Sequence, residues 1–397
     1  MMTTQAQAAV AQDGDWERAL EAVLGQTTGV AEHGGGIDLA FLFASASYGD
    51  DLPVLVRRAR SATGARVLVG CSGQGIIGPS REIEGQPAVA LLSLSLPGAE
   101  LHGVRLTQSA IEERLRPGEW YEATGVDPDA AHAWFVFADP FTINPEALVA
   151  ALSAGYPGLP LIGGLASGEP RVQRTLVFLD DEVYPDGAVA VALGGAYTVR
   201  TVVSQGAEPI SEPWTITAVD GQRIQTIAQR PALDVLVESV RRLPPEARQR
   251  AERNLLIGLA MDEYRDDFGR GDFLIRNLAG ADPKTGQVAI GALPRVGQTI
   301  QFQLRDAEAA DEELRELLAR EKASHGDNPP LAAVLCSCNA RGAGLFGTPD
   351  HDALALAEQL DIDPVAGFFC NGEIGPVGER NFLHGYTASI ALIVPAE

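Results

Sequence analysis

The chain repeats one pattern of apolar and polar positions three times. In each copy an apolar run is followed by an amphipathic helical stretch, a second apolar run, a glycine-rich excursion and a third apolar run. The first runs are 39–43, 134–137 and 332–335, the second are 67–70, 161–164 and 365–368, and the third are 88–92, 188–191 and 390–394. Short continuous apolar runs between turn residues are typical of buried strands. The pattern therefore predicts an α/β fold with mixed sheets, built from repeated strand–helix–strand–strand units.

Helix starts can be predicted in two of these units. Asn144 before Pro145 and Thr348 before Pro349 have the chemistry of an N-cap followed by the first helical residue. The cap oxygen accepts a hydrogen bond from a backbone amide, and proline has no amide that would stay unpaired. Helical spacing of apolar residues predicts two more helices, over 52–62 and 15–24.

The remaining segments indicate two domains, as does the length of 397 residues. Alternating apolar and polar positions over 197–229 predict a hairpin that closes the first domain, which places the boundary near Arg230. The predicted domains are therefore 1–230 and 231–397. In the second domain we expect an antiparallel meander over 273–278, 287–293 and 299–304, then a charged helix over 307–322 and the third repeated unit.

Each second apolar run ends in a similar glycine corner. The three glycine corners are Cys71-Ser72-Gly73-Gln74, Ala166-Ser167-Gly168-Glu169 and Cys370-Asn371-Gly372-Glu373. Open α/β sheets hold their ligands at the carboxyl ends of strands. We therefore predict that the corners gather around a pocket, where the glycines expose backbone groups and Ser72, Ser167 and Asn371 hydrogen-bond a small polar or anionic ligand. The alternative is that each corner is only a tight turn, which needs the glycine but not its polar neighbours.

Arg341 is a candidate for fixing the charge of such a ligand. It lies in the glycine-rich loop Cys338-Asn339-Ala340-Arg341-Gly342, and its planar guanidinium suits a carboxylate or a phosphate. A salt bridge to Glu373 or to another nearby acid is the equally weighted alternative. In both cases we expect Arg341 and Glu373 to belong to one polar network.

The cysteines raise other possibilities. Cys338 or Cys370 could be the nucleophile of a thiol-dependent enzyme with His384 as its base, although nothing in the sequence fixes that pairing. A zinc site that includes Cys336 and Cys338 is disfavoured, because alternate residues of a strand are splayed along it. Buried, inert thiols are the simplest interpretation, and we expect a protein without catalytic activity.

A nucleotide cofactor is also disfavoured. Residues 73–78 match the G-x-G-x-x-G fingerprint, but 79–85 lead into a strand and not into the helix that the fingerprint requires.

Composition excludes several classes of partner. The net charge of −23 opposes binding to nucleic acid or to an anionic membrane, because both need a basic face. No apolar stretch has the length of a membrane span, and residues 1–15 lack the pattern of a secretory signal. Four cysteines in a chain of this length fit a reducing compartment. We therefore expect a cytoplasmic location.

Several segments resemble the FIST sensory domain family. The resemblance to its C-terminal half lies in 336–342, 365–369, 372–376 and 383–387, and the resemblance to its N-terminal half lies in 69–72, 205–210 and 220–221. The most specific of these is Gly372-Glu373-Ile374-Gly375-Pro376. The segments follow the family's order over nearly the whole chain.

The resemblance implies a signal-input module that binds a small ligand such as an amino acid or a small carboxylate. No output domain remains once both halves are counted, so the signal would pass to a separate protein such as a histidine kinase. Some stand-alone members of the family bind haem and report nitric oxide to such a kinase. In this chain His384 would be the axial haem ligand. Family members often carry a cysteine and a basic residue where this chain has Ala207 and Glu208, which puts a ligand or redox role at those positions in doubt.

Overall fold

The computed structural model describes residues 4–30, 35–113, 117–168, 172–265, 267–269, 271–325 and 329–396. They form two compact units, one of Met1–Val203 with Arg315–Glu397 and the other of Ser204–Leu314. The predicted boundary near Arg230 lies inside the second unit. This is because β16 (Arg223–Ile227), which precedes Arg230, pairs with β20 (Gln287–Ile290) in the sheet of that unit.

The first unit contains the three predicted repeats, and each has two parallel strands joined by a helix and a third, antiparallel strand. The first repeat has β2 (Leu39–Ser45), α3 (Leu52–Thr63), β3 (Val67–Gly73) and β6 (Ala88–Ser95). The second has β8 (Ala131–Ala138), α6 (Pro145–Gly155), β9 (Leu161–Leu165) and β12 (Ala188–Gly195). The third has β22 (Ala332–Cys338), α11 (His351–Leu360), β23 (Val365–Cys370) and β26 (Ala388–Pro395). The predicted α/β class and its repeated unit are confirmed.

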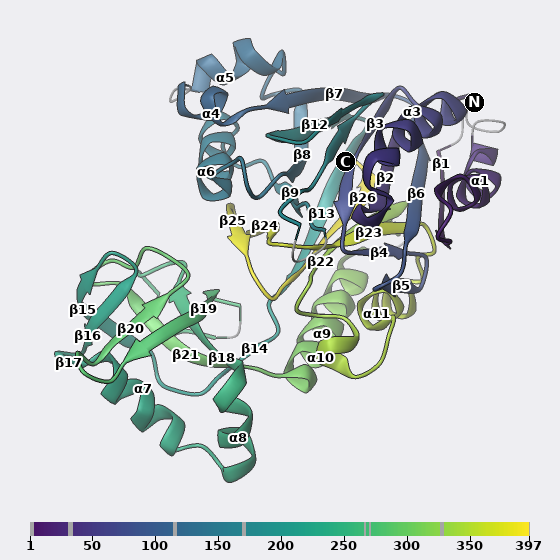
Figure 1. Cartoon of the computed structure of the whole chain (residues 1–397). Coiled ribbons are helices and arrows are strands. Elements are labelled where there is room, and N and C mark those ends of the chain that lie inside the picture. The colour runs from purple at the N-terminus through teal and green to yellow at the C-terminus, as the bar shows by residue number, and fades with distance from the viewer. Residues whose placement is uncertain are drawn as a thin grey trace. The chain divides into compact units, whose positions relative to one another are not determined.

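Each repeat also sends a hairpin into the sheet of another repeat (Figure 1). The hairpin β4 (Gly75–Gly78) and β5 (Arg81–Glu84) of the first repeat adds to β23. The hairpin β10 (Val177–Leu179) and β11 (Glu182–Tyr184) of the second repeat adds to β3. The hairpin β24 (Glu373–Val377) and β25 (Arg380–His384) of the third repeat adds to β9. The three sheets are therefore linked in a ring by exchanged hairpins.

An outer strand completes each sheet to six strands. These strands are β1 (Gln5–Gln12) beside β6, β7 (Ala99–Leu106) beside β12, and β13 (Tyr197–Ser204) beside β26. The inner faces of the sheets share one core, where the rings of Phe43, Phe137 and Phe368, one from each sheet, lie 5.1 to 5.9 Å apart. Helices cover outer faces, as α1 (Trp16–Thr27) and α3 do on the sheet of β2.

The parallel strands of each repeat approach closely at a glycine. A Cβ atom on Gly70 would lie 1.7 Å from the carbonyl oxygen of Leu42, and one on Gly367 would lie 1.8 Å from that of Leu335. In the second repeat, a Cβ on Gly163 would lie 1.9 Å from the carbonyl oxygen of Val136. The same contact in all three repeats indicates that the strand pairing itself excludes a side chain at this position.

We expect the substitution Gly367→Ala to destabilise the protein by at least about 3 kcal/mol, because the clash is with backbone that cannot rotate away. The control is Gly25→Ala in α1, where nothing lies within 4 Å of the added Cβ. That change is expected to stabilise the helix by up to about 1 kcal/mol. Urea unfolding monitored by circular dichroism measures both, and a Gly367→Ala protein as stable as the wild type would contradict the close approach.

The second unit is built around an antiparallel barrel. Its strands are β14 (Ala207–Pro209), β15 (Trp214–Asp220), β16, β17 (Arg230–Pro231), β18 (Leu255–Ala260), β19 (Phe273–Asp282), β20 and β21 (Thr299–Arg305). Its helices are α7 (Ala232–Arg241) and α8 (Pro245–Asn254). The order β21-β15-β16-β20-β19-β18 closes because β18 also pairs with β21. The predicted meander is therefore correct for β19 and β20 but wrong for β21, because the β15–β16 hairpin lies between β20 and β21.

The remaining helices are short or lie between strands. They are η1 (Ala46–Asp51), α4 (Gln108–Glu113), α5 (Pro117–Thr124), α9 (Ala307–His325) and α10 (Ala343–Phe346). None of the helices in the described ranges is long and apolar enough to cross a membrane.

One of the two predicted N-caps is confirmed. Asn144 Oδ1 accepts a hydrogen bond from the amide of Ala147 at 3.0 Å at the start of α6. The prediction for Thr348 is wrong, because α11 begins at His351 after Asp350, whose φ of 67° is left-handed. The carboxylate of Asp350 does not cap its own helix and instead accepts a hydrogen bond from the amide of Glu82 on β5 at 2.6 Å.

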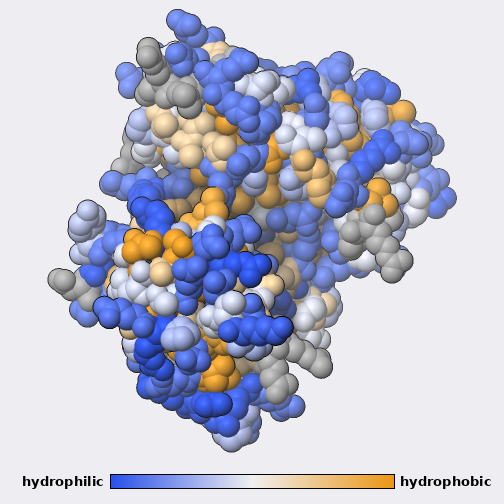
Figure 2. Space-filling view, turned by 60° about the vertical axis from the view of Figure 1, so that its left-hand side comes forward, coloured by the Kyte–Doolittle hydropathy of each residue, from blue (hydrophilic) through white to orange (hydrophobic). Residues whose placement is uncertain are grey.

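Hydrophilic side chains cover most of the face seen in Figure 2. The exposed large apolar side chains are Val54, Phe141, Val172, Tyr264, Leu293, Val296 and Leu354.

Candidate functional site

The structure brings the three glycine corners together. Ser72 Oγ donates a hydrogen bond to the carbonyl oxygen of Ser167 at 3.1 Å, and the amide of Gln74 donates to Ser167 Oγ at 2.7 Å. Ser167 Oγ in turn donates a hydrogen bond to the carbonyl oxygen of Phe369. The side-chain amide of Asn371 donates one to the carbonyl oxygen of Ala166. Glu169, the last residue of the second corner, lies outside the described residues. The corners thus form one hydrogen-bonded junction between the three repeats.

The glycines of the corners serve the packing of this junction. A Cβ on Gly73 would lie 3.1 Å from the Cβ of Phe368, and one on Gly372, whose φ is 152°, would lie 3.0 Å from Leu165 Cδ1. A Cβ on Gly168 would lie 3.1 Å from the Cβ of Ala46. The glycines that we expected to expose backbone to a ligand therefore face protein atoms.

A cavity of about 180 Å³ opens beside the first corner, at the carboxyl ends of β2 and β3. Its lining residues are Ala46, Ser47, Gly49, Leu52, Ser72, Val172, Arg174 and Leu176. Ser72 is the predicted site residue that lines this cavity. Gly168 lies behind its wall, against Ala46 and the backbone of Arg174. The carboxyl ends of parallel strands are where α/β sheets commonly bind ligands.

The cavity has a positive character. Arg174 is the charged residue among the described residues that line it, and none of those residues is acidic. Leu52, the first residue of α3, also lines it, so the positive end of that helix dipole adds to the charge of Arg174. The guanidinium of Arg174 contacts the carboxylate of Asp50 at 3.0 Å, but both side chains are exposed, so this pair is held weakly. The cavity is suited to a small anion.

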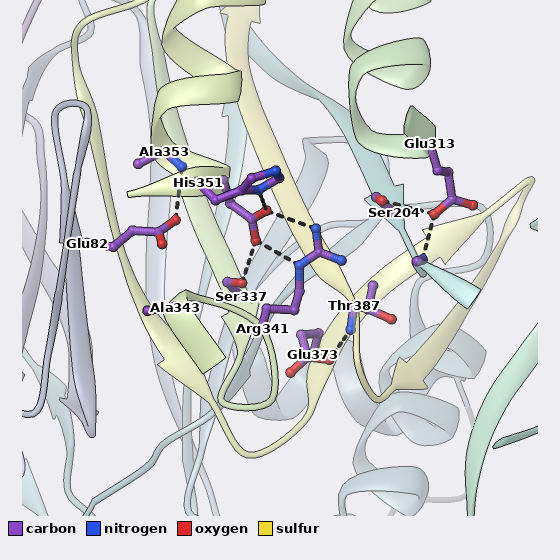
Figure 3. Close-up of polar contacts among 12 residues, drawn as sticks. Glu82, Ser204, Glu313, Ser337, Arg341, Ala343, His351, Ala353, Glu373 and Thr387 are labelled. Atoms are coloured by element: carbon purple, nitrogen blue, oxygen red, sulfur yellow. Dashed lines mark hydrogen bonds and ion pairs between the residues drawn. The ribbon is translucent and has the colours of Figure 1, made fainter. Parts of the chain in front are cut away.

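Arg341 lies elsewhere and pairs with an acid of its own repeat (Figure 3). Its Nε and Nη2 atoms donate to the two carboxylate oxygens of Asp352 at 2.7 and 2.8 Å, and both side chains are 1% exposed. Ser337 Oγ donates to the same carboxylate at 2.8 Å, and the guanidinium lies over the ring of Phe346. The acid that pairs with Arg341 is therefore Asp352 and not Glu373, and its guanidinium is committed to a structural pair.

Two buried glutamates flank this pair. Burial raises the pKa of Glu82 to about 8, with a smaller contribution from the nearby Asp352 carboxylate. Burial likewise raises the pKa of Glu373 to about 8, although the amide of Thr387, the Cys338 thiol and Arg341 oppose it. Burial also raises the pKa of Asp352, but the Arg341 guanidinium outweighs burial and lowers it overall. Near neutral pH the pair is therefore ionised while the two glutamates retain their protons.

The cysteines are poorly suited to catalysis. Burial, with a smaller contribution from the adjacent Glu373 carboxylate, raises the pKa of the Cys338 thiol to about 12. Burial also raises the pKa of the Cys370 thiol well above its usual range. A catalytic thiol needs a lowered pKa, and the pKa values of both of these thiols are raised.

The environment of His384 does not fit a haem ligand. His384 is 3% exposed, and its Nε2 lies 2.9 Å from the carbonyl oxygen of Gly375, within the β24–β25 hairpin. It does not line the cavity described above. An axial ligand needs a nitrogen directed into an apolar pocket that accommodates the macrocycle, and this histidine instead contacts backbone.

The sequence did not single out several residues of these sites. Asp352 and Glu82 escaped notice because each is an ordinary acid next to a turn, and only the fold brings them to Arg341. The cavity residues Ser47, in the short helix η1, and Arg174, in a loop, were missed because neither belongs to a sequence motif. One signal was available, since loops that follow the first strand of an α/β unit are frequent ligand-binding segments.

The chain is similar to uncharacterized mycobacterial proteins over most of its length. A protein of Mycobacterium tuberculosis is 40% identical over 363 residues, which cover 91% of this chain and 92% of that protein. A protein of Mycobacterium bovis is 38% identical over 358 residues and 90% of each chain.

The resemblance to solved structures is distant. A cyanuric acid hydrolase from A. caulinodans aligns over 100% of both chains with 11% identity and a TM-score of 0.37. T. maritima PurL complexed with ATP aligns over 99% of this chain and 72% of its own with 10% identity and a TM-score of 0.26. These scores are too low to support an inference about this protein.

Two family models match the chain one after the other. The FIST N domain matches residues 38–230 and the FIST C domain matches residues 232–376. Together they include the three glycine corners, the cavity and the Arg341–Asp352 pair. The chain therefore belongs to the FIST family of sensory domains of signal transduction.

Proposed function

We propose that this protein is a sensory module that binds a small anionic molecule, an amino acid or a small carboxylate, in the cavity at the carboxyl ends of β2 and β3. It would act in the cytoplasm and pass its signal to a separate protein such as a histidine kinase. The observation that carries this proposal is the cavity itself, which joins a predicted corner residue, Ser72, to the cation Arg174.

The size and lining of the cavity favour such a ligand. Pockets for drug-sized ligands measure about 300–1,000 Å³, so a cavity of about 180 Å³ fits only a small metabolite. Arg174 and the start of α3 offer positive charge to a carboxylate. Leu52, Val172 and Leu176 offer apolar contact to a short aliphatic part. Ser47, which is exposed, offers a hydroxyl group at the same site.

Two other functions have less support. A haem-dependent nitric oxide sensor would need an axial ligand, and His384 is hydrogen-bonded to backbone. A thiol-dependent enzyme would need a thiolate, whereas burial raises the pKa values of Cys338 and Cys370.

We expect a thermal-shift screen with amino acids and small carboxylates to identify stabilising ligands. A ligand at one hundred times its dissociation constant should stabilise the folded state by about 2.7 kcal/mol. The substitution Arg174→Ala should abolish this stabilisation, because it removes the cation that lines the cavity. The matched control is Arg57→Ala, an exposed arginine on α3 that does not line the cavity. A ligand that stabilises the Arg174→Ala protein as much as the wild type would contradict this site.

A further inference from the structure

The β4–β5 hairpin connects the cavity of the first repeat with the Arg341–Asp352 pair of the third. At its near end Ser72 lines the cavity and is tied to Leu176 on the opposite wall. The amide of Ser72 donates to the carbonyl oxygen of Leu176 at 2.8 Å, and the amide of Leu176 donates to Ser72 Oγ at 3.0 Å. β4 begins at Gly75, three residues after Ser72. The cavity wall is therefore directly connected to the root of the hairpin.

The second strand of the hairpin, β5, holds the starts of two helices in the third repeat, and its Glu84 lies opposite Gly75 at the root of the hairpin. Glu84 accepts a hydrogen bond from the amide of Ala343, the first residue of α10, at 2.8 Å. Glu82 accepts one from the amide of Ala353 in the first turn of α11 at 3.0 Å (Figure 3). Glu82 and Glu84 lie two residues apart on β5, so one strand supports both ends of the segment 342–353.

The hairpin is packed too tightly to absorb a displacement. A Cβ on Gly75 would lie 2.6 Å from the ring of Phe369, and one on Gly73 would lie 3.1 Å from the Cβ of Phe368. On the side of the third repeat, a Cβ on Gly342 would lie 2.6 Å from the carboxylate of Glu84. Close-packed elements transmit small displacements because they cannot deform continuously.

We propose that the β4–β5 hairpin transmits occupation of the cavity to the segment 342–353, which is the output segment of the sensor. The inference rests on the proposed function only in taking this cavity as the ligand site. The exchange of hairpins between repeats makes this transmission possible, because a hairpin that belongs to the first repeat contacts helices of the third. The two-state element is the pair of helix starts, which is either held by β5 or released from it.

The test places an occupant in the cavity by covalent attachment, so that it does not depend on the identity of the natural ligand. Ser47 lines the cavity and is exposed, so Ser47→Cys supplies an accessible thiol. Iodoacetate then adds a carboxymethyl group, and iodoacetamide adds a neutral group of similar size as the matched control. The native Cys71, Cys336 and Cys370 are buried, and burial raises the pKa of Cys338. Mass spectrometry on the wild type checks that these four thiols stay unmodified.

Hydrogen exchange measured by mass spectrometry is the readout. We expect the carboxymethylated protein to exchange at least about threefold more slowly over 342–353 than the unlabelled variant, since bound-state order protects amides. Adding Glu84→Ala should remove this protection at α10 while leaving it over 45–52, where the group is attached. Val172→Cys, on the opposite side of the same cavity, repeats the experiment if Ser47→Cys does not fold.

The outcomes separate the coupling from the binding site. Slower exchange over 45–52 without any change over 342–353 overturns the proposed coupling and leaves the proposed binding site intact. Protection over 342–353 that persists after Glu84→Ala shows that the hairpin is not the route, which also overturns the proposal. A third outcome is that the thermal-shift screen finds no stabilising ligand while carboxymethylation still protects 342–353. That result would count against the proposed ligand class and support the coupling.

Discussion

The substitution Asp352→Ala is expected to destabilise the protein by about 3–5 kcal/mol, because it leaves the Arg341 guanidinium buried without its counter-charge. Arg341 and Asp352 are each 1% exposed and share two hydrogen bonds of 2.7 and 2.8 Å. Ser337 Oγ loses its acceptor in the same variant. Chemical denaturation at pH 7 measures the loss, and a change below about 1 kcal/mol would contradict a desolvated pair.

Two controls separate the cost of a stranded charge from the loss of an attraction. Replacing both partners, Arg341→Met with Asp352→Leu, should recover much of the stability, because no buried charge remains. Asp186→Ala removes the partner of Arg105 in an exposed pair, and should change stability by no more than about 1 kcal/mol. If the double variant is as unstable as Asp352→Ala alone, the loss must come from packing and not from the unpaired charge.

The repeated unit could be predicted from the sequence because its signals are local. The continuous apolar runs at 39–43, 134–137 and 332–335 fall within β2, β8 and β22, since buried parallel strands are apolar on both faces. Asn144 could be recognised as a cap because the amide that donates a hydrogen bond to it, that of Ala147, is only three residues away. Signals of this range are contained in a short window of sequence.

The exchange of hairpins could not be predicted, because it depends on contacts between distant segments. Ile77 of β4 lies opposite Gly367 of β23, and nothing in either local sequence specifies the other. The strand order of the barrel could not be predicted for the same reason, since β21 pairs with β15 and β18, which are separated from it in the sequence by other elements. Register between remote strands is fixed by the tertiary packing of their faces and not by local pattern.

The candidate site shows the same limit. The sequence indicated a polar network around Arg341, with a ligand or a salt bridge to Glu373 or another nearby acid as alternatives, whereas Glu373 accepts a hydrogen bond from the amide of Thr387. The true partner, Asp352, is eleven residues from Arg341 and lies in the first turn of α11. The sequence placed the start of that helix at Thr348, three residues too early, so the positions of the side chains in its first turn were wrong as well. A one-turn error in a helix start was sufficient to conceal the strongest ion pair of the site.

Stability is expected to fall as the pH rises from about 5 to 8, which is the reverse of ordinary acid denaturation. Burial raises the pKa values of Glu82 and Glu373 from 4.5 to about 8 in the folded protein. Between these values the unfolded chain has released both protons while the folded protein retains them. The free energy of unfolding therefore decreases by about 1.4 kcal/mol per pH unit for each group. The stability that the two protonated glutamates contribute is fully present below pH 4.5 and is lost as the pH rises through 8.

The substitutions Glu82→Gln and Glu373→Gln test this dependence, since glutamine keeps the shape and the acceptor oxygen but cannot ionise. Each should reduce the slope measured by urea unfolding at pH 6, 7 and 8 by about 1.4 kcal/mol per pH unit, and the double variant by about twice that. Asp352 does not interfere, because its pKa is lowered and its contribution is lost only in acid. An unchanged slope in both single variants would mean that the glutamates are already ionised in the folded protein. The buried network around Arg341 would then carry two additional negative charges at neutral pH, which its single cation cannot neutralise.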